Sequence, residues 1–131
     1  MFVDASATLA ILLAEPEKSL FARKLSVARR KIVSPISLFE VTANLMRIRK
    51  IPLHETNDLV RGFLQRTEVE TVAIDAEIGR LALSAFDRYG RGRHKAKLNF
   101  GDCFAYACAK AHRVPLLFKG NDFVHTDIEQ A

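Results

Sequence analysis

Four acidic residues are placed along the chain so that each lies beside a segment with a regular apolar pattern. They are Asp4, Glu40, Asp102 and Asp122. Carboxylate oxygens without histidine or thiol partners favour a hard cation, Mg²⁺ or Mn²⁺. Several carboxylates at close range raise each other's pKa, so the group is unfavourable without a cation. If the four acids meet, they predict a metal centre whose bound waters can attack phosphorus and contact phosphate oxygens.

The first two acids also have ordinary structural explanations. Asp4 follows an apolar strand and is a favoured helix N-cap residue, although Ser6 can provide the cap instead. Glu40 shares a helix face with Asn44 and Arg47, opposite the expected core stripe, and such a face is usually solvated. Neither residue alone predicts a functional site.

The other two acids are ambiguous in the same way. With Asn99 as N-cap, Asp102 occupies the third helical position, where an acid completes a capping box. Its helix, however, is apolar on nearly all sides, so an ionised Asp102 needs a partner. Asp122 ends the segment Lys119-Gly120-Asn121-Asp122, which is typical turn sequence.

The elements that would position these acids alternate between strand and helix. Strands are predicted at residues 1–4, 31–34, 70–74 and 115–118, and helices at residues 7–14, 16–29, 35–50, 53–67, 76–89 and 100–112. The predicted N-caps are Ser6, Ser34, Asp75 and Asn99. This alternation predicts an α/β fold in one domain, residues 1–131, with a mostly parallel sheet covered on both faces. Such sheets bind ligands at the carboxyl ends of their strands, and all four acids map to that edge.

A basic segment, Gly90 to Asn99, separates the last two predicted helices. If the helix before it runs away from the carboxyl edge, ten extended residues reach ~33 Å and return past a helix of ~23 Å. The segment then ends beside the acids. Its basic residues, Arg91, Arg93, Lys95 and Lys97, are candidates for RNA phosphate contact. A solvated loop without function explains them equally well.

The composition is typical of a globular protein, and its positive charge favours binding to polyanions. The net charge is +5 over 131 residues, with a sequence pI of about 9.5. Cys103 and Cys108 lie five residues apart in one predicted helix, so we expect two buried free thiols and no disulfide or zinc site. No secretion signal or bilayer-length apolar run is visible, and we expect a cytoplasmic protein without membrane contact.

Five segments together resemble the PIN-domain family, and within it the VapC toxins of bacterial toxin–antitoxin pairs. Phe2–Ser6 is similar to the family's first acid with its following serine, and Ser37–Val41 to the helix of the second acid. Leu98–Ala107 resembles the third-acid signature almost residue for residue. Leu116–Phe123, followed by Thr126–Asp127, is similar to the closing motif and the fourth acid.

This resemblance implies a three-layer α/β/α sandwich and a Mg²⁺- or Mn²⁺-dependent endoribonuclease. By carry-over, the four acids bind the metal and activate water, and Ser6 orients Asp4 or a metal-bound water. The resemblance also implies a homodimer, a structured RNA substrate such as tRNA or rRNA, and a cognate VapB-type antitoxin that covers the site.

Two alternatives stay open at this stage. A haloacid-dehalogenase-like phosphatase also begins with an acid after its first strand, but Ser6 stands where its second carboxylate belongs. A non-catalytic module that binds RNA or a partner would be indicated by a missing acid, and none of the four is missing.

Overall fold

Four short strands form the centre of the computed structural model, which describes residues 1–131. They are β1 (Phe2–Val3), β2 (Ile32–Val33), β3 (Glu70–Thr71) and β4 (Leu116–Leu117). Their order in the sheet is β3-β2-β1-β4, and all three pairings are parallel. The predicted parallel sheet is confirmed, although each strand is shorter than the segment that predicted it.

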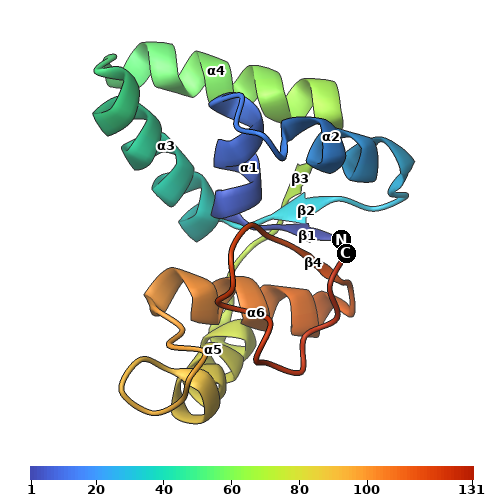
Figure 1. The fold of residues 1–131 in the computed structure, drawn as a ribbon, viewed down its shortest axis with the longest axis vertical. Coiled ribbons are helices and arrows are strands. Elements are labelled where there is room, and N and C mark those ends of the chain that lie inside the picture. Colours follow the sequence, from blue (N-terminus) through green and yellow to red (C-terminus); the bar gives the residue numbers. More distant parts are fainter.

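Six helices cover the two faces of this sheet and produce three layers (Figure 1). The helices α1 (Ala5–Leu12), α2 (Lys18–Val27), α3 (Pro35–Arg49) and α4 (Leu53–Thr67) lie on one side, and α5 (Ala76–Tyr89) and α6 (Phe100–His112) lie on the other. The predicted number and order of helices are correct. The second helix begins two residues later than expected and ends at Val27. None of the helices has the length and apolar character needed to cross a membrane.

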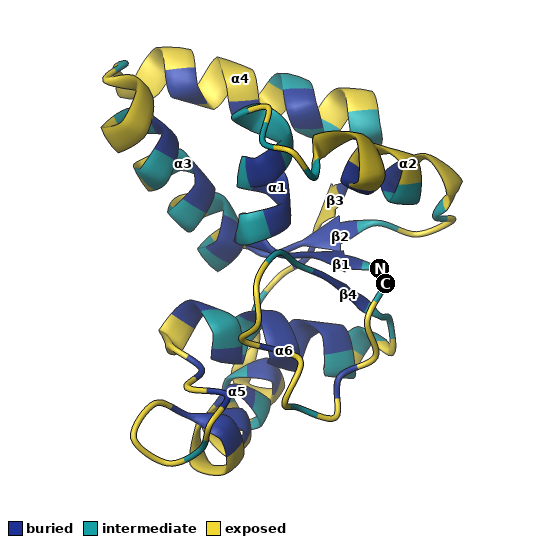
Figure 2. Cartoon of the chain, in the orientation of Figure 1, coloured by how far each residue is buried: buried dark blue, intermediate teal, exposed yellow.

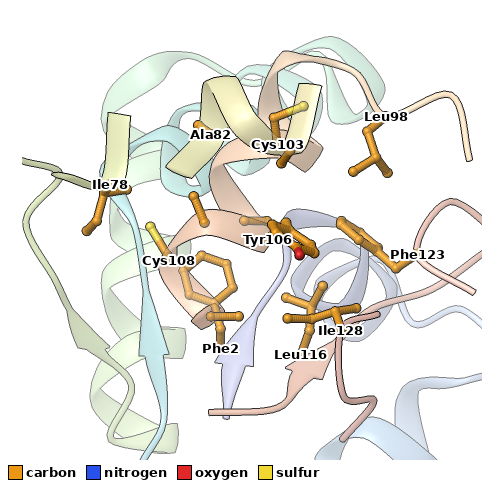
Figure 3. Close-up of a cluster of buried hydrophobic side chains, with 14 of the residues drawn as sticks. Phe2, Ile78, Ala82, Leu98, Cys103, Tyr106, Cys108, Leu116, Phe123 and Ile128 are labelled. Carbon is orange, nitrogen blue, oxygen red and sulfur yellow. The ribbon is translucent and has the colours of Figure 1, made fainter. Parts of the chain in front are cut away.

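The core is divided by the sheet because neighbouring strand residues point to opposite faces. Phe2, Ile32 and Leu116 pack beneath α5 and α6, in the cluster drawn in Figure 3. The residues that follow them, Val3, Val33 and Leu117, pack on the other face with α1 and α2. Burial on both faces explains why β1, β2 and β4 are apolar throughout, whereas the edge strand β3 is polar and exposed (Figure 2).

The two cysteines lie on α6, in the part of the core that this helix and α5 form with the sheet. Both are free and buried, as predicted. Burial is the first cause that raises the pKa of each thiol to about 11, so neither is a reactive thiolate near neutral pH.

Helix caps follow the predictions except at α1. Ser34, Asp75 and Asn99 cap α3, α5 and α6 through their side chains. The predicted cap of α1 at Ser6 is wrong: the helix begins at Ala5, and the side chain of Asp4 accepts the capping hydrogen bond from the Ser6 N–H. The acid directly after β1 therefore turns the chain into the helix without an intervening residue.

The basic segment does not climb past a helix as the sequence suggested. Gly90 and Leu98 form a parallel bridge, with hydrogen bonds of 3.0 Å from Arg91 N–H to Leu98 O and from Leu98 N–H to Tyr89 O. The two ends of the loop are thus side by side, next to the start of α6. The premise about the preceding helix is wrong, because α5 ends where α6 begins.

Candidate active site

Asp4 lies at the carboxyl end of β1 and exposes only 6% of its surface. Its Oδ2 accepts hydrogen bonds from the Ser6 backbone N–H at 2.9 Å and from the Ser6 hydroxyl at 2.5 Å. Burial is the main cause that raises the pKa of Asp4, the charge of Asp122 raises it further, and the bonds from Ser6 oppose both. Asp4 is therefore a helix cap and, at the same time, a buried acid whose ionised form is disfavoured.

Ser6 connects Asp4 to a second strand end. Its hydroxyl donates to Asp4 and accepts a hydrogen bond from the backbone N–H of Lys119 at 2.9 Å. Lys119 leads from β4 into the turn that carries Asp122. Of the two roles expected for Ser6, this geometry favours the orientation of Asp4.

Glu40 lies on α3 and is half-buried, where helical periodicity alone predicts a solvated face. That interpretation is wrong because α6 packs against α3, and the Glu40 carboxylate lies against Gly101. No protein hydrogen bond reaches this carboxylate. Burial raises the pKa of Glu40 to about 7, with further contributions from the charges of Asp4 and Asp102.

Asp102 forms the predicted capping box at the start of α6. Its Oδ2 accepts from the Asn99 N–H at 2.9 Å, and the Asn99 Oδ1 accepts from the Asp102 N–H at 2.9 Å. Burial raises the pKa of Asp102 to about 6, and the charges of Asp4 and Asp122 contribute in the same direction. The Asn99 N–H and the charge of Arg91 act against this rise.

Asp122 is exposed in the turn after β4. Gly120 has a φ of +99°, a backbone conformation that favours glycine, and it bends this turn. The charge of Asp122 contributes to the raised pKa values of both Asp4 and Asp102. The turn thus brings a fourth carboxylate within electrostatic reach of the buried acids.

The structure brings the four predicted acids to one edge of the sheet, where three of them have raised pKa values. A cation would relieve this repulsion, and the donor set consists only of hard oxygen ligands. No three of the acidic, histidine or cysteine side chains are arranged, as they stand, to hold one ion directly. Mg²⁺ commonly binds through one or two carboxylates and keeps several waters, so the residues present fit such an ion.

The four basic loop residues differ in their surroundings, although all are exposed. The charge of Arg91 lowers the pKa of Asp102, which indicates that Arg91 lies near the acids. The guanidinium of Arg93 is instead 2.9 Å from Asp87 and lies over the ring of Phe86. Lys95 and Lys97 make no ion pair. Arg91 is therefore the basic loop residue best placed to act beside the acids.

Two contacts near the site were not predicted from the sequence. The Lys119 ammonium lies 2.7 Å from Glu15 and 3.0 Å from Glu17, so the lysine nearest Asp122 in sequence is already paired. Asp127, in the closing motif, accepts a hydrogen bond from Tyr106 at 2.5 Å and one from Lys110 at 3.2 Å. Asp127 anchors the C-terminal segment to α6 and does not join the four acids.

The chain is similar to a known protein family along nearly its whole length. The PIN domain model matches residues 1–129, which removes the haloacid-dehalogenase-like alternative. A VapC ribonuclease of Rhizobium meliloti is 42% identical and covers 97% of this chain and 98% of its own length. Among solved structures, Mycobacterium tuberculosis VapC20, described as a sarcin–ricin loop cleaving toxin, has a TM-score of 0.74 at 18% identity, covering 99% of this chain and 97% of its own.

A toxin–antitoxin complex from Klebsiella pneumoniae has a TM-score of 0.71 at 18% identity, covering 96% of this chain and 92% of the matched one. At this identity the two solved structures support the fold alone. The family model and the curated relative each extend over nearly the whole chain. The chain therefore belongs to the PIN-domain family and, within it, to the VapC ribonucleases.

Proposed function

We propose that this protein is a metal-dependent endoribonuclease and the toxin of a type II toxin–antitoxin pair. The observation that carries the proposal is the convergence of Asp4, Glu40, Asp102 and Asp122 at the carboxyl edge of the sheet, with raised pKa values at the first three. Repelling carboxylates at a binding edge are expected where a cation is part of the function. Membership of the VapC ribonucleases supports RNA as the substrate.

The four acids are the proposed ligands of Mg²⁺ or Mn²⁺. When bound, such an ion lowers the pKa of a water molecule and neutralises charge on a phosphate group. Asp4 is held in place by Ser6, and Asp102 by the Asn99 N–H. The Glu40 carboxylate has no protein hydrogen bond, so its two oxygens are available to the ion and to the water that the ion would hold. Arg91 supplies positive charge beside Asp102 for the scissile phosphate.

Structured RNA, such as tRNA or rRNA, is the proposed substrate. The basic loop and a net charge of +5 favour binding to a phosphate backbone. VapC20, which shares the fold, is described as cleaving the sarcin–ricin loop. We also propose that this protein acts in the cytoplasm, where tRNA and rRNA are found.

A VapB-type antitoxin is the proposed protein partner, and its C-terminal segment would cover the acids and block cleavage. The solved toxin–antitoxin complex with the same fold supports this pairing. Co-purification with the antitoxin would therefore mask the activity, and the free protein must be used in assays.

A homodimer is the proposed assembly, with a groove between α5 and α6 as the contact. The groove has a volume of about 660 Å³ and a mostly apolar lining that includes Phe86, Phe104 and Cys103. Leu83 and Phe100 also line it and are 71% and 68% exposed. The exposed apolar side chains at the rim of the groove provide what a two-fold interface needs: the same apolar surface on both copies. Its occupant is therefore proposed to be a second copy of the chain.

The experiment that tests the function is cleavage of total RNA by the purified, antitoxin-free protein. The arms contain Mg²⁺, excess EDTA, and Mg²⁺ with Asp4→Asn. We expect discrete cuts that require the metal and disappear in the variant. Absence of cutting by folded wild-type protein would favour the non-catalytic binding module, and cutting that persists in EDTA would contradict the metal centre.

A further inference from the structure

Gly101, in the first turn of α6, is in contact with the carboxylate of Glu40. A Cβ built on Gly101 would lie 1.7 Å from Glu40 Oε1, 2.6 Å from Cδ and 2.9 Å from Oε2. All three distances are shorter than real Cβ contacts. The Glu40 carboxylate, at the end of a flexible side chain, thus occupies the space of a Cβ at position 101 and would have to leave this position if one were present.

Local conformation does not explain this glycine. Gly101 lies inside a helix, and the glycines with positive φ are Gly92 and Gly120. In a helix, glycine is less favourable than alanine by ~1 kcal/mol. The cost of a glycine at position 101 is therefore offset by something other than backbone geometry, and the contact with Glu40 provides the reason.

We propose that Gly101 is a positioning residue: its missing side chain lets the Glu40 carboxylate lie against the first turn of α6, beside Asp102, as a metal ligand. The inference rests on the proposed metal-dependent function. The start of a helix carries partial positive charge, which favours a carboxylate there. The glycine leaves room for the carboxylate of Glu40, on α3, at the start of α6, where Asp102 also lies.

Gly79 offers a matched control. It also lies near the start of a helix, α5, and a Cβ built on it meets nothing within 4 Å. The same substitution, glycine to alanine, is therefore expected to stabilise α5 slightly without affecting the four acids. Because Gly79 lines the groove between α5 and α6, the variants are compared in the same oligomeric state. Any different effect at Gly101 is attributable to its neighbour.

The first part of the test measures thermal stability in EDTA, so that it is independent of metal. The proteins are wild type, Gly101→Ala, Glu40→Ala, the double variant, and Gly79→Ala. We expect Gly101→Ala to raise the melting temperature less when Glu40 is present than when Glu40 is replaced by alanine, because only in the first case must a carboxylate move out of the way. Equal shifts in both backgrounds would overturn the proposed contact.

The second part measures Mn²⁺ binding by electron paramagnetic resonance and by calorimetry. We expect Gly101→Ala to weaken binding ~10–100-fold, as other residues that orient metal ligands do. In Gly101→Ala, the distance from the new Cβ to Glu40 Oε1 must increase from 1.7 Å to about 3 Å. Aspartate is shorter than glutamate by one carbon–carbon bond of about 1.5 Å, which is close to the displacement required. Glu40→Asp should therefore weaken binding alone but partly restore it in the Gly101→Ala background.

Unchanged Mn²⁺ affinity in Gly101→Ala, or no rescue by Glu40→Asp, would overturn the positioning role. If the wild-type protein binds no Mn²⁺, the proposed function fails and the metal role of Gly101 fails with it. The stability measurements in EDTA distinguish this case, because they report the contact between Gly101 and Glu40 without any metal.

Discussion

The hydroxyl of Ser6 accepts a hydrogen bond from the backbone N–H of Lys119 at 2.9 Å and donates its own proton to Asp4. One small side chain therefore joins the carboxyl ends of β1 and β4. The acid that follows β1 and the turn that carries Asp122 are held at a fixed separation by this contact. Because Asp4 N–H also donates to Leu117 O at 2.9 Å, the two strand ends are connected through both backbone and side chain.

Replacement of Ser6 by alanine is expected to weaken metal binding as well as folding. The variant loses one neutral hydrogen bond and one bond to a carboxylate, which together cost ~1–3 kcal/mol of the free energy of unfolding. Loss of a residue that orients a metal ligand typically costs ~10–100-fold in affinity. Mn²⁺ titration and RNA cleavage rates measure this effect. Ser26→Ala, on exposed α2, is the control, and equal Mn²⁺ affinity in both variants would remove Ser6 from the site.

Replacement of Asp102 by asparagine should abolish cleavage while preserving the fold. An asparagine still offers an oxygen to the Asn99 N–H, so the capping box is kept, but the charge that repels Asp4 and Asp122 is gone. We expect a loss of at least ~10² in cleavage rate and a higher melting temperature in EDTA at pH 8. Asp75→Asn, which changes the cap of α5 outside the site, should keep full activity. Normal cleavage by Asp102→Asn would show that this acid only ends a helix.

The raised pKa values also predict how metal-free stability depends on pH. The folded protein holds a proton on Glu40 up to about pH 7 and on Asp102 up to about pH 6, above the ordinary values of 4.5 and 3.8. Between the ordinary and raised values the folded state binds more protons than the unfolded state, so stability rises as pH falls from 8 to 5. Thermal denaturation in EDTA should show a smaller rise for Glu40→Gln. Parallel curves for the two proteins would contradict the raised pKa of Glu40.

The sequence predicted the parts of this molecule that depend on local pattern. Apolar runs separated by amphipathic segments were sufficient for the parallel sheet, and Ser34, Asp75 and Asn99 marked three helix starts correctly. The capping box at Asp102 was also predicted, because both partners lie within one turn of helix. At α1 the sequence offered two candidate caps, Asp4 and Ser6, and Asp4 provides the cap because the helix begins at Ala5, directly after it.

Features that depend on packing between distant segments were not accessible in the same way. Periodicity assigned Glu40 to a solvated face, since nothing in α3 indicates that α6 packs against it. The closure of the basic loop at Gly90 and Leu98 likewise depends on the direction of α5, which length alone does not determine. A glycine in the first turn of an otherwise apolar helix was the one available signal for the contact with Glu40.

Arg91 is expected to contribute more to RNA cleavage than Arg93. The Arg93 guanidinium is already paired with Asp87 at 2.9 Å, whereas Arg91 has no ion pair and its charge acts on Asp102. Arg91→Ala should therefore reduce the cleavage rate at saturating metal, and each lost phosphate contact should reduce the salt dependence of RNA binding by ~0.7–0.9 in log–log slope. Arg93→Ala is the matched control. Equal effects of the two substitutions would indicate that the loop acts only as a diffuse basic surface.

The groove between α5 and α6 predicts the effect of a charge on assembly. Leu83 is 71% exposed at the groove, and aspartate in its place would have to be buried in a dimer without a partner. We expect Leu83→Asp to weaken self-association by ~10² or more, as measured by sedimentation velocity. Val27→Asp on α2, where valine is 76% exposed, provides the same substitution on a surface outside the groove and should leave the dimer intact. A monomeric wild type, or an unchanged dimer in Leu83→Asp, would assign the groove to another occupant such as the antitoxin.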